Sequence, residues 1–162
     1  MKKLLIMRHA KAETPPDCPS DFERPLAQRG RLDACFAGNL FNEKNLVPDL
    51  IISSGAKRAI TTAELFAENS GYTEKIEKNY DFYNAYLEDV LSIIKNVPES
   101  VNTLMITGHN PTWENLASRL TGEFILMPTC AIAILDFNNH KWSEITYNTC
   151  KLTDLIKPKE LR

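Results

Sequence analysis

The sequence lacks long hydrophobic runs and an excess of basic residues. Its N-terminal apolar run, Leu4 to Met7, stops at Arg8, and this is too short for a secretion signal or a membrane span. A net charge of −2 over 162 residues is unlike that of nucleic-acid or anionic-membrane binders, which usually carry a large basic excess. We therefore expect a cytoplasmic protein with no nucleic-acid partner and no membrane partner.

Paired cysteines are also missing. The four cysteines, Cys18, Cys35, Cys130 and Cys150, lie far apart and form no C-x-x-C pair. This spacing predicts neither a zinc site nor a disulfide framework. Cys35 and Cys130 have apolar neighbours, and we expect them to be small core residues.

The composition is that of an ordinary soluble domain, with 43% hydrophobic and 25% charged residues. The chain is long enough to bury a core, and no composition break or internal repeat divides it. We expect a single domain over residues 1–162.

Apolar runs alternate with helical patterns along the chain. Strands are expected at 3–8, 49–53, 74–78 and 103–107, and helices at 30–42, 56–69, 86–96 and from Asn110-Pro111 onward. In the first helix, Leu32, Phe36 and Leu40 have the spacing of an apolar face. Such alternation predicts a three-layer α/β/α sandwich with a largely parallel central sheet.

The C-terminal part carries a different pattern. Residues 131–137 and 142–147 flank a polar turn, which predicts a β-hairpin that adds an antiparallel element to the sheet. The last ten residues are polar and weakly patterned, and we expect a tail or a short docking segment.

Three strands end in residues suited to phosphate chemistry. The first runs into Arg8-His9, the second into Ser53-Ser54 with Arg58 shortly after, and the fourth into Gly108-His109. Ligands in open α/β sheets bind beyond the carboxyl ends of the strands. Two arginines and two histidines are therefore expected to meet at one edge of the sheet.

A histidine at a strand end can be a nucleophile, a general base, a metal ligand or a core residue bonded to a backbone carbonyl. The arginine beside His9 and the second histidine at an equivalent position favour a function. Guanidinium groups repel cations, and no acidic residue joins either histidine at a ligand spacing, so we expect no metal. Nearby positive charge would keep His9 neutral, with a lone pair free for attack.

Each remaining candidate also has a structural interpretation. Arg58 could be a surface residue of an amphipathic helix, but the small residues before it allow a ligand to approach, and Lys57 is the better surface candidate. The planar guanidinium group of Arg58 suits paired hydrogen bonds to phosphate. His109 could cap a helix in solvent, or it could stabilise a phosphoryl group at a helix N-terminus. We expect His140 to be an exposed turn residue.

These residues resemble those of a known family. Arg8-His9-Ala10, Asp21-Phe22-Glu23-Arg24-Pro25-Leu26, Ser53-Ser54 through Arg58 and Gly108-His109-Asn110-Pro111 are similar, in order and separation, to the motifs of the histidine phosphatase (phosphoglycerate mutase-like) superfamily, and most of all to its SixA-type phosphohistidine phosphatases. The resemblance implies that His9 becomes phosphorylated. It also implies that Arg8, Arg58 and His109 complete the catalytic, phosphate-binding pocket, without metal or organic cofactor.

The general acid of larger family members is not evident. Glu13 and Asp21 are candidates in a loop, and Glu88 and Asp89 in a helix. A phosphomonoester needs a proton donor for its alkoxide, whereas phosphohistidine leaves as imidazole once its ring is protonated. The leading hypothesis is therefore a phosphatase acting on a phosphohistidine-bearing signalling or phosphotransfer protein.

Two alternatives stay open. One is a phosphatase that acts on a small phosphorylated substrate, such as a sugar or nucleotide monoester, and the other is a non-catalytic phosphate-binding module. An open site would favour the protein substrate and a closed pocket the small molecule. The sequence makes no prediction of the oligomeric state.

Overall fold

A six-stranded mixed sheet forms the centre of the molecule, in a computed structural model that describes all 162 residues. The strand order is β3-β2-β4-β1-β5-β6, with β1 to β4 mutually parallel and β5 antiparallel to both β1 and β6. The strands are β1 Lys2–Arg8, β2 Leu50–Ser54, β3 Glu77–Asn79, β4 Thr103–Gly108, β5 Ile132–Phe137 and β6 Cys150–Ile156.

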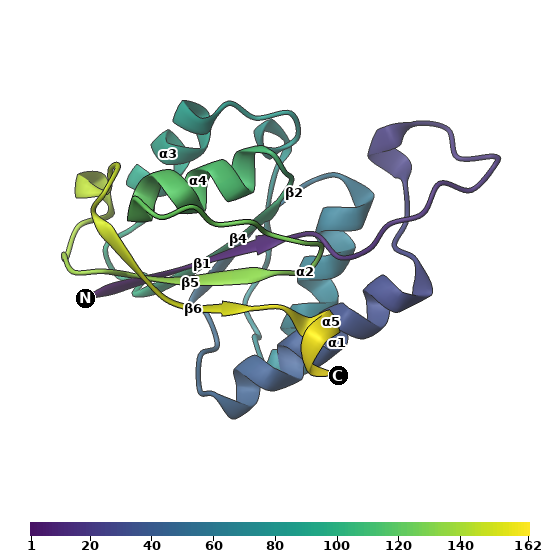
Figure 1. Cartoon of the computed structure of the whole chain (residues 1–162), viewed down its shortest axis with the longest axis horizontal. Helices are drawn as coiled ribbons and strands as arrows, with labels where there is room; N and C mark the ends of the chain where they lie inside the picture. Colours follow the sequence, from purple (N-terminus) through teal and green to yellow (C-terminus); the bar gives the residue numbers. More distant parts are fainter.

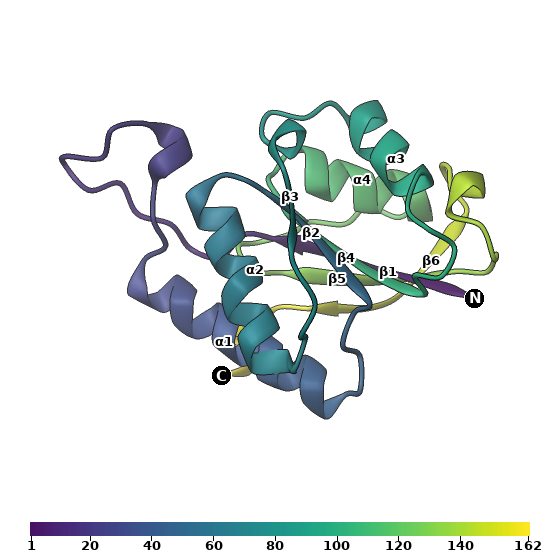
Figure 2. The ribbon, with the colours of Figure 1, turned by 180° about the vertical axis from the view of Figure 1, so that it is seen from behind.

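Helices cover both faces of this sheet. They are α1 Gln28–Glu43, α2 Lys57–Ser70, α3 Leu87–Lys95, α4 Thr112–Thr121 and the short α5 Pro158–Leu161, with single 3₁₀ turns at Asp21–Glu23, Tyr80–Phe82 and Trp142–Glu144. In Figures 1 and 2, α1, α2 and α5 lie on one face and α3 and α4 on the other. The predicted three-layer α/β/α fold is thus confirmed. None of the five helices combines the length and the hydropathy that crossing a membrane requires.

Alternate side chains of β1 enter two separate cores. Leu4 and Ile6 pack with residues of α3 and α4, whereas Leu5 and Met7 pack with residues of α1 and α2. Successive residues of a strand point to opposite faces, so a strand between two helix layers must be apolar at every position. All four side chains are fully buried, and each such burial contributes about 1.5–3 kcal/mol. These cores fix the strand from which the first functional residues emerge.

The buried face of α1 differs from the expected one. Leu32 is 53% exposed, and the face that packs inward carries small residues such as Ala34, Ala37 and Gly38. Any Cβ at Gly38 would lie 2.5 Å from the carbonyl oxygen of Phe66. Close approach of α1 to α2 therefore selects small residues here. Of the expected residues Leu40 does pack against the core on this face, next to the fully buried Phe41, whereas Leu32 does not.

The expected hairpin partner of β5 is also corrected. Residues 142–147 contain the 3₁₀ turn, and β5 pairs instead with β6, which begins at Cys150. Trp142 and Ile145 are both fully buried, a three-residue spacing that suits a turn of helix and not a strand. The last ten residues complete this edge strand and α5, and Arg162 contacts the buried Asp33 of α1 at 2.5 Å. They are not a free tail.

Candidate active site

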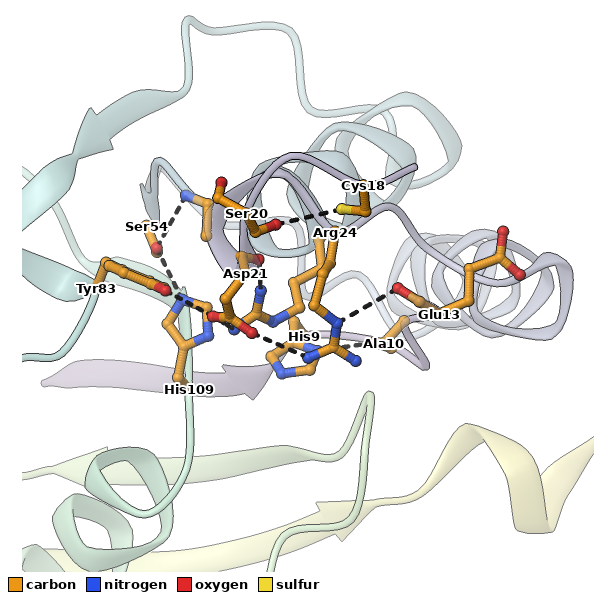
Figure 3. Close-up of polar contacts among 12 residues, drawn as sticks. His9, Ala10, Glu13, Cys18, Ser20, Asp21, Arg24, Ser54, Tyr83 and His109 are labelled. Atoms are coloured by element: carbon orange, nitrogen blue, oxygen red, sulfur yellow. Dashed lines mark hydrogen bonds and ion pairs between the residues drawn. The ribbon is translucent and has the colours of Figure 1, made fainter. Parts of the chain in front are cut away.

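The carboxyl edge of the sheet brings the predicted residues together. β1 and β4 are adjacent and in register, with Arg8 opposite Gly108, and the backbone N–H of His9 donates to the carbonyl of Gly108. The rings of His9 and His109 consequently lie with their centroids 5.3 Å apart. Figure 3 shows both rings below the loop that carries Asp21 and Arg24.

The protonation of His9 is set by its backbone partner. Nδ1 lies 2.8 Å from the carbonyl oxygen of Ala10. A carbonyl can only accept a hydrogen bond, so Nδ1 carries the proton and Nε2 has the free lone pair. The N–H of Ala10 donates to Thr62 Oγ1, which in turn donates to the carbonyl of Arg58. A buried threonine thus links the loop after His9 to the helix that carries Arg58.

Burial and positive charge keep His9 neutral. The side chain is 8% exposed, and its pKa is lowered to about 4, chiefly because burial disfavours the charged ring. The carbonyl of Ala10 opposes this shift, while Arg58, Arg8 and Arg24 add to it. At neutral pH the ring is uncharged, and its Nε2 can act as a nucleophile.

His109 has a different partner. Its Nε2 lies 2.8 Å from the hydroxyl of Ser54 at the end of β2, and its buried Nδ1 has no hydrogen-bond partner. The pKa of His109 is lowered to about 3 by burial first, then by His9 and Arg58. Because a hydroxyl can donate or accept, this contact is compatible with either tautomer.

The two arginines differ in what holds them. Arg58, in the first turn of α2, is 7% exposed, whereas its neighbour Lys57 is exposed as expected. Nη1 of Arg58 donates to the carbonyl of Asp21 and Nη2 to its carboxylate, at 2.8 and 3.1 Å. Arg8 donates to the carbonyl of Met127, its Nε is buried without a partner, and burial lowers its pKa.

The loop of residues 11–27 supplies a carboxylate to this cluster. Asp21 Oδ2 accepts from the hydroxyl of Tyr83 at 2.6 Å and Oδ1 accepts from Arg24 at 3.2 Å. The pKa of Asp21 falls to about 2, first because of Tyr83 and then because of Arg58 and Arg24. Asp21 is therefore ionised in this structure, and its three hydrogen-bond donors disfavour the protonated form that a proton donor needs.

Sequence patterns placed Ser54 at the strand end but missed Tyr83 and Thr62 as parts of the site. The Tyr83 ring packs edge-on against the His109 ring, with centroids 5.5 Å apart, and its hydroxyl contacts Asp21. Tyr83 follows a three-residue strand and a 3₁₀ turn, where no periodicity gives a position. Thr62 could have been found from its place one turn beyond Arg58, where its hydroxyl donates to the Arg58 carbonyl. His140 is exposed at the β5–β6 connection, as expected.

Two guanidinium groups and two neutral imidazoles in one cluster suit a phosphoryl dianion. Among all residues, no three His, Cys, Asp or Glu side chains lie together as a metal-binding group. Comparison with known proteins agrees with the phosphate chemistry, because the model of the histidine phosphatase superfamily (branch 1) matches residues 4–89.

The chain belongs to the histidine phosphatase superfamily. The matched segment runs from β1 into α3, so it includes Arg8, His9, Asp21 and Arg58, while His109 lies beyond it. Membership supports phosphatase activity. It does not by itself define the substrate.

Relatives of this superfamily member include two proteins that are described as uncharacterized. A chloroplastic protein of Arabidopsis thaliana is 29% identical over 88% of this chain and 70% of its own length. A protein of Mycobacterium leprae is 28% identical over 94% of this chain and all of its own length.

Solved structures place this superfamily member near SixA proteins. A protein assigned as the phosphohistidine phosphatase SixA of Agrobacterium tumefaciens has a TM-score of 0.83 at 29% identity, covering 97% of this chain and 98% of that one. SixA with bound tungstate has a TM-score of 0.85 at 20% identity, covering 99% of both chains. At 14% identity, a protein of Escherichia coli assigned as an α-ribazole-5′-phosphate phosphatase shares the fold with a TM-score of 0.75, covering 98% of both chains.

Proposed function

We propose that this protein is a phosphohistidine phosphatase in which His9 is the nucleophile. The observation that carries the proposal is the hydrogen bond from His9 Nδ1 to the carbonyl of Ala10. It fixes the proton on Nδ1 and leaves the Nε2 lone pair free beside Arg58, Arg8 and His109. A nucleophile with this lone pair needs no general base.

The other residues hold and stabilise the phosphoryl group. Arg8 and Arg58 bind its oxygens through charge-assisted hydrogen bonds, each worth about 1.5–3 kcal/mol. In the transfer step, Nε2 of His9 bonds to phosphorus while the bond to the substrate's leaving atom breaks. His109 stabilises the charge on the phosphoryl oxygens during this transfer, in the manner of an oxyanion-hole donor.

Phosphohistidine fits the proton balance of this site. When the substrate ring carries a proton on its other nitrogen, breaking the P–N bond releases neutral imidazole, and His9 becomes the phosphorylated imidazolium. One imidazole replaces another, and no proton has to move. A phosphoserine would leave as an alkoxide, and the ionised Asp21 cannot supply the proton that it needs.

In the second step, the phosphoryl group passes from His9 to water. The water oxygen bonds to phosphorus, the P–Nε2 bond breaks, and the electron pair returns to Nε2. The two water protons leave with the phosphate product or pass to solvent. His9 is regenerated as the Nδ1-protonated neutral ring, which matches the ligand-free structure.

Short connections at the carboxyl edge support a protein as the substrate. Only residues 55–56 separate β2 from α2, and only 109–111 separate β4 from α4. The loops that can rise beside the histidines are 9–27, 80–86 and 122–131, the last of which bonds to the backbones of Arg8 and His9, and the side chain of Asp21 is 53% exposed. Similarity to the SixA proteins agrees with a phosphohistidine-bearing protein as partner.

A leaving-group series tests this function. We expect the kcat/KM values for a phosphohistidine protein and for activated aryl phosphates to exceed that for phosphoserine about a hundred- to a thousandfold, a barrier difference of roughly 3–4 kcal/mol. Acid quench during turnover should trap a phosphoenzyme that is acid-labile and alkali-stable. Efficient turnover of one sugar or nucleotide phosphate would favour the small-molecule alternative, and binding without turnover would favour a phosphate-binding module.

A further inference from the structure

The carboxylate of Asp21 stands at the mouth of the site with its acceptor sites incompletely used. Tyr83 and Arg58 donate to Oδ2, and Arg24 donates to Oδ1. A carboxylate offers about four lone-pair positions, so one further donor can be accepted. The side chain is 53% exposed, which leaves it open to a bound molecule.

Asp21 does not prevent Arg58 from binding phosphate. The two contacts from Arg58 use one N–H each of Nη1 and Nη2, and a guanidinium has five N–H groups. The remaining donors can bind phosphoryl oxygens while Asp21 stays in place. Carboxylate and phosphoryl group can therefore flank the same guanidinium, close to one another.

The position of the Asp21 carboxylate bears on whether it can contact the leaving group. His9 projects from β1, and Asp21 belongs to the loop on the other side of the His9 ring, between Tyr83 and Arg24 (Figure 3). The attacking and leaving atoms lie roughly in line across phosphorus. The leaving group therefore departs on the side of phosphorus opposite His9. Asp21 is tied to Arg58 and to Tyr83, whose ring packs on His109, so its exposed carboxylate is within the cluster that surrounds the phosphoryl group.

We infer that Asp21 is a specificity-determining residue whose carboxylate accepts a hydrogen bond from the ring N–H of the substrate's phosphohistidine. This inference rests on the proposed function. The contact holds the ring in its protonated, cationic form, so that P–N cleavage leaves the electron pair on the phosphorylated nitrogen and releases neutral imidazole. The N–H proton stays on the substrate throughout, and Asp21 donates nothing.

The same carboxylate disfavours phosphate esters. An alkoxide or phenolate that develops negative charge beside Asp21 is repelled, whereas an imidazolium is attracted. The pKa of Asp21, lowered to about 2, keeps the carboxylate charged over the working pH range. One residue would thus favour phosphoramidates over phosphomonoesters whose leaving groups are equally good.

Asp21→Asn tests the assignment, with Glu23→Gln as the matched control. Glu23 lies in the same 3₁₀ turn, is exposed, and makes no hydrogen bond or ion pair through its side chain. We would measure kcat/KM for phosphoimidazole and for p-nitrophenyl phosphate. Asp21→Asn should lower the ratio of kcat/KM for phosphoimidazole to kcat/KM for p-nitrophenyl phosphate about 10- to 100-fold, which is the range of a charge-assisted hydrogen bond. Glu23→Gln should leave this ratio unchanged.

Equal losses on both substrates would overturn the inference, because Asp21 would then act only by holding Arg58. Tyr83→Phe keeps the ring packed against His109 and removes the hydroxyl donor to Asp21, so it should change the ratio by less than Asp21→Asn does. Failure of the proposed function has a different signature: the unsubstituted protein itself would not prefer phosphoimidazole over phosphoserine.

Discussion

His9 and His109 occupy equivalent places at the ends of two paired parallel strands, yet their hydrogen bonds differ. His9 has a backbone carbonyl as partner of Nδ1, and His109 has the hydroxyl of Ser54 as partner of Nε2. The carbonyl accepts only, so it fixes the tautomer of His9. The hydroxyl leaves His109 free to place its proton on either nitrogen.

The difference assigns distinct chemistry to two similar residues. A nucleophile needs one ring nitrogen unprotonated at all times, and the rigid partner of His9 provides this. A group that stabilises phosphoryl oxygens needs an N–H that can be presented when the ligand arrives. His109 has a buried Nδ1 without a partner, and a phosphoryl oxygen in the site would satisfy it.

The largest expected effects come from substituting the two histidines, and the two variants should differ in whether a phosphoenzyme forms. His9→Ala should abolish turnover, by at least about 10⁴-fold, and no acid-labile phosphate should form because the nucleophile is gone. His109→Gln should slow turnover about 10²- to 10³-fold, the usual cost of one oxyanion-hole donor, while the phosphoenzyme still accumulates. Phosphoenzyme would be measured by acid quench with radiolabelled substrate.

His140→Ala controls for the loss of a histidine, because His140 is exposed at the β5–β6 connection and contacts neither ring. It should retain full activity. Clear turnover by His9→Ala, or an acid-labile phosphate in that variant, would assign the nucleophile to another residue.

The second effect concerns pH and stability. In an unfolded chain histidine titrates near 6.5, while the pKa of His9 is about 4 in the folded protein. Between these values the unfolded chain binds a proton that the folded protein does not, so the free energy of unfolding falls as the pH decreases from about 6.5 to about 4. His9 accounts for up to roughly 3 kcal/mol of this loss.

Urea unfolding at several pH values would measure the slope. His9→Gln cannot titrate, so it should flatten the decline over that window. Because the pKa of His109 is about 3, His109 continues to lower the free energy of unfolding at pH values below those at which His9 contributes. An unchanged slope in His9→Gln would mean that the folded protein binds a proton at His9 as easily as the unfolded chain.

How far the sequence predicted this site depends on the element that carries each residue. Arg8, His9 and His109 follow strongly apolar strands, and parallel topology then requires their convergence. Tyr83 and the contacts of Asp21 come from loops whose paths depend on tertiary packing, so periodicity could not place them. The buried face of α1 was predicted from the spacing of large apolar residues. The close contact at Gly38 requires small residues on that face, and this spacing does not detect them.

The smallest expected effect concerns Ser54, the partner that makes His109 different from His9. Ser54→Ala removes the hydroxyl that contacts Nε2 of His109 and accepts from the N–H of Ala56. We expect kcat to fall about tenfold, near 1.4 kcal/mol, with little change in KM. Ser70→Ala is the matched control, because Ser70 is equally buried in α2 and its hydroxyl bonds only to the carbonyl of Ala67.

A double-mutant cycle decides whether Ser54 acts through His109. If it does, Ser54→Ala should cost about tenfold in the natural background and almost nothing in a His109→Gln background, since the group it orients is already gone. Additive losses would show that Ser54 supports catalysis by another route, such as its contact with Ala56 ahead of Arg58. In that case the hydroxyl would serve the arginine, and the contrast between the two histidines would rest on the backbone carbonyl of Ala10 alone.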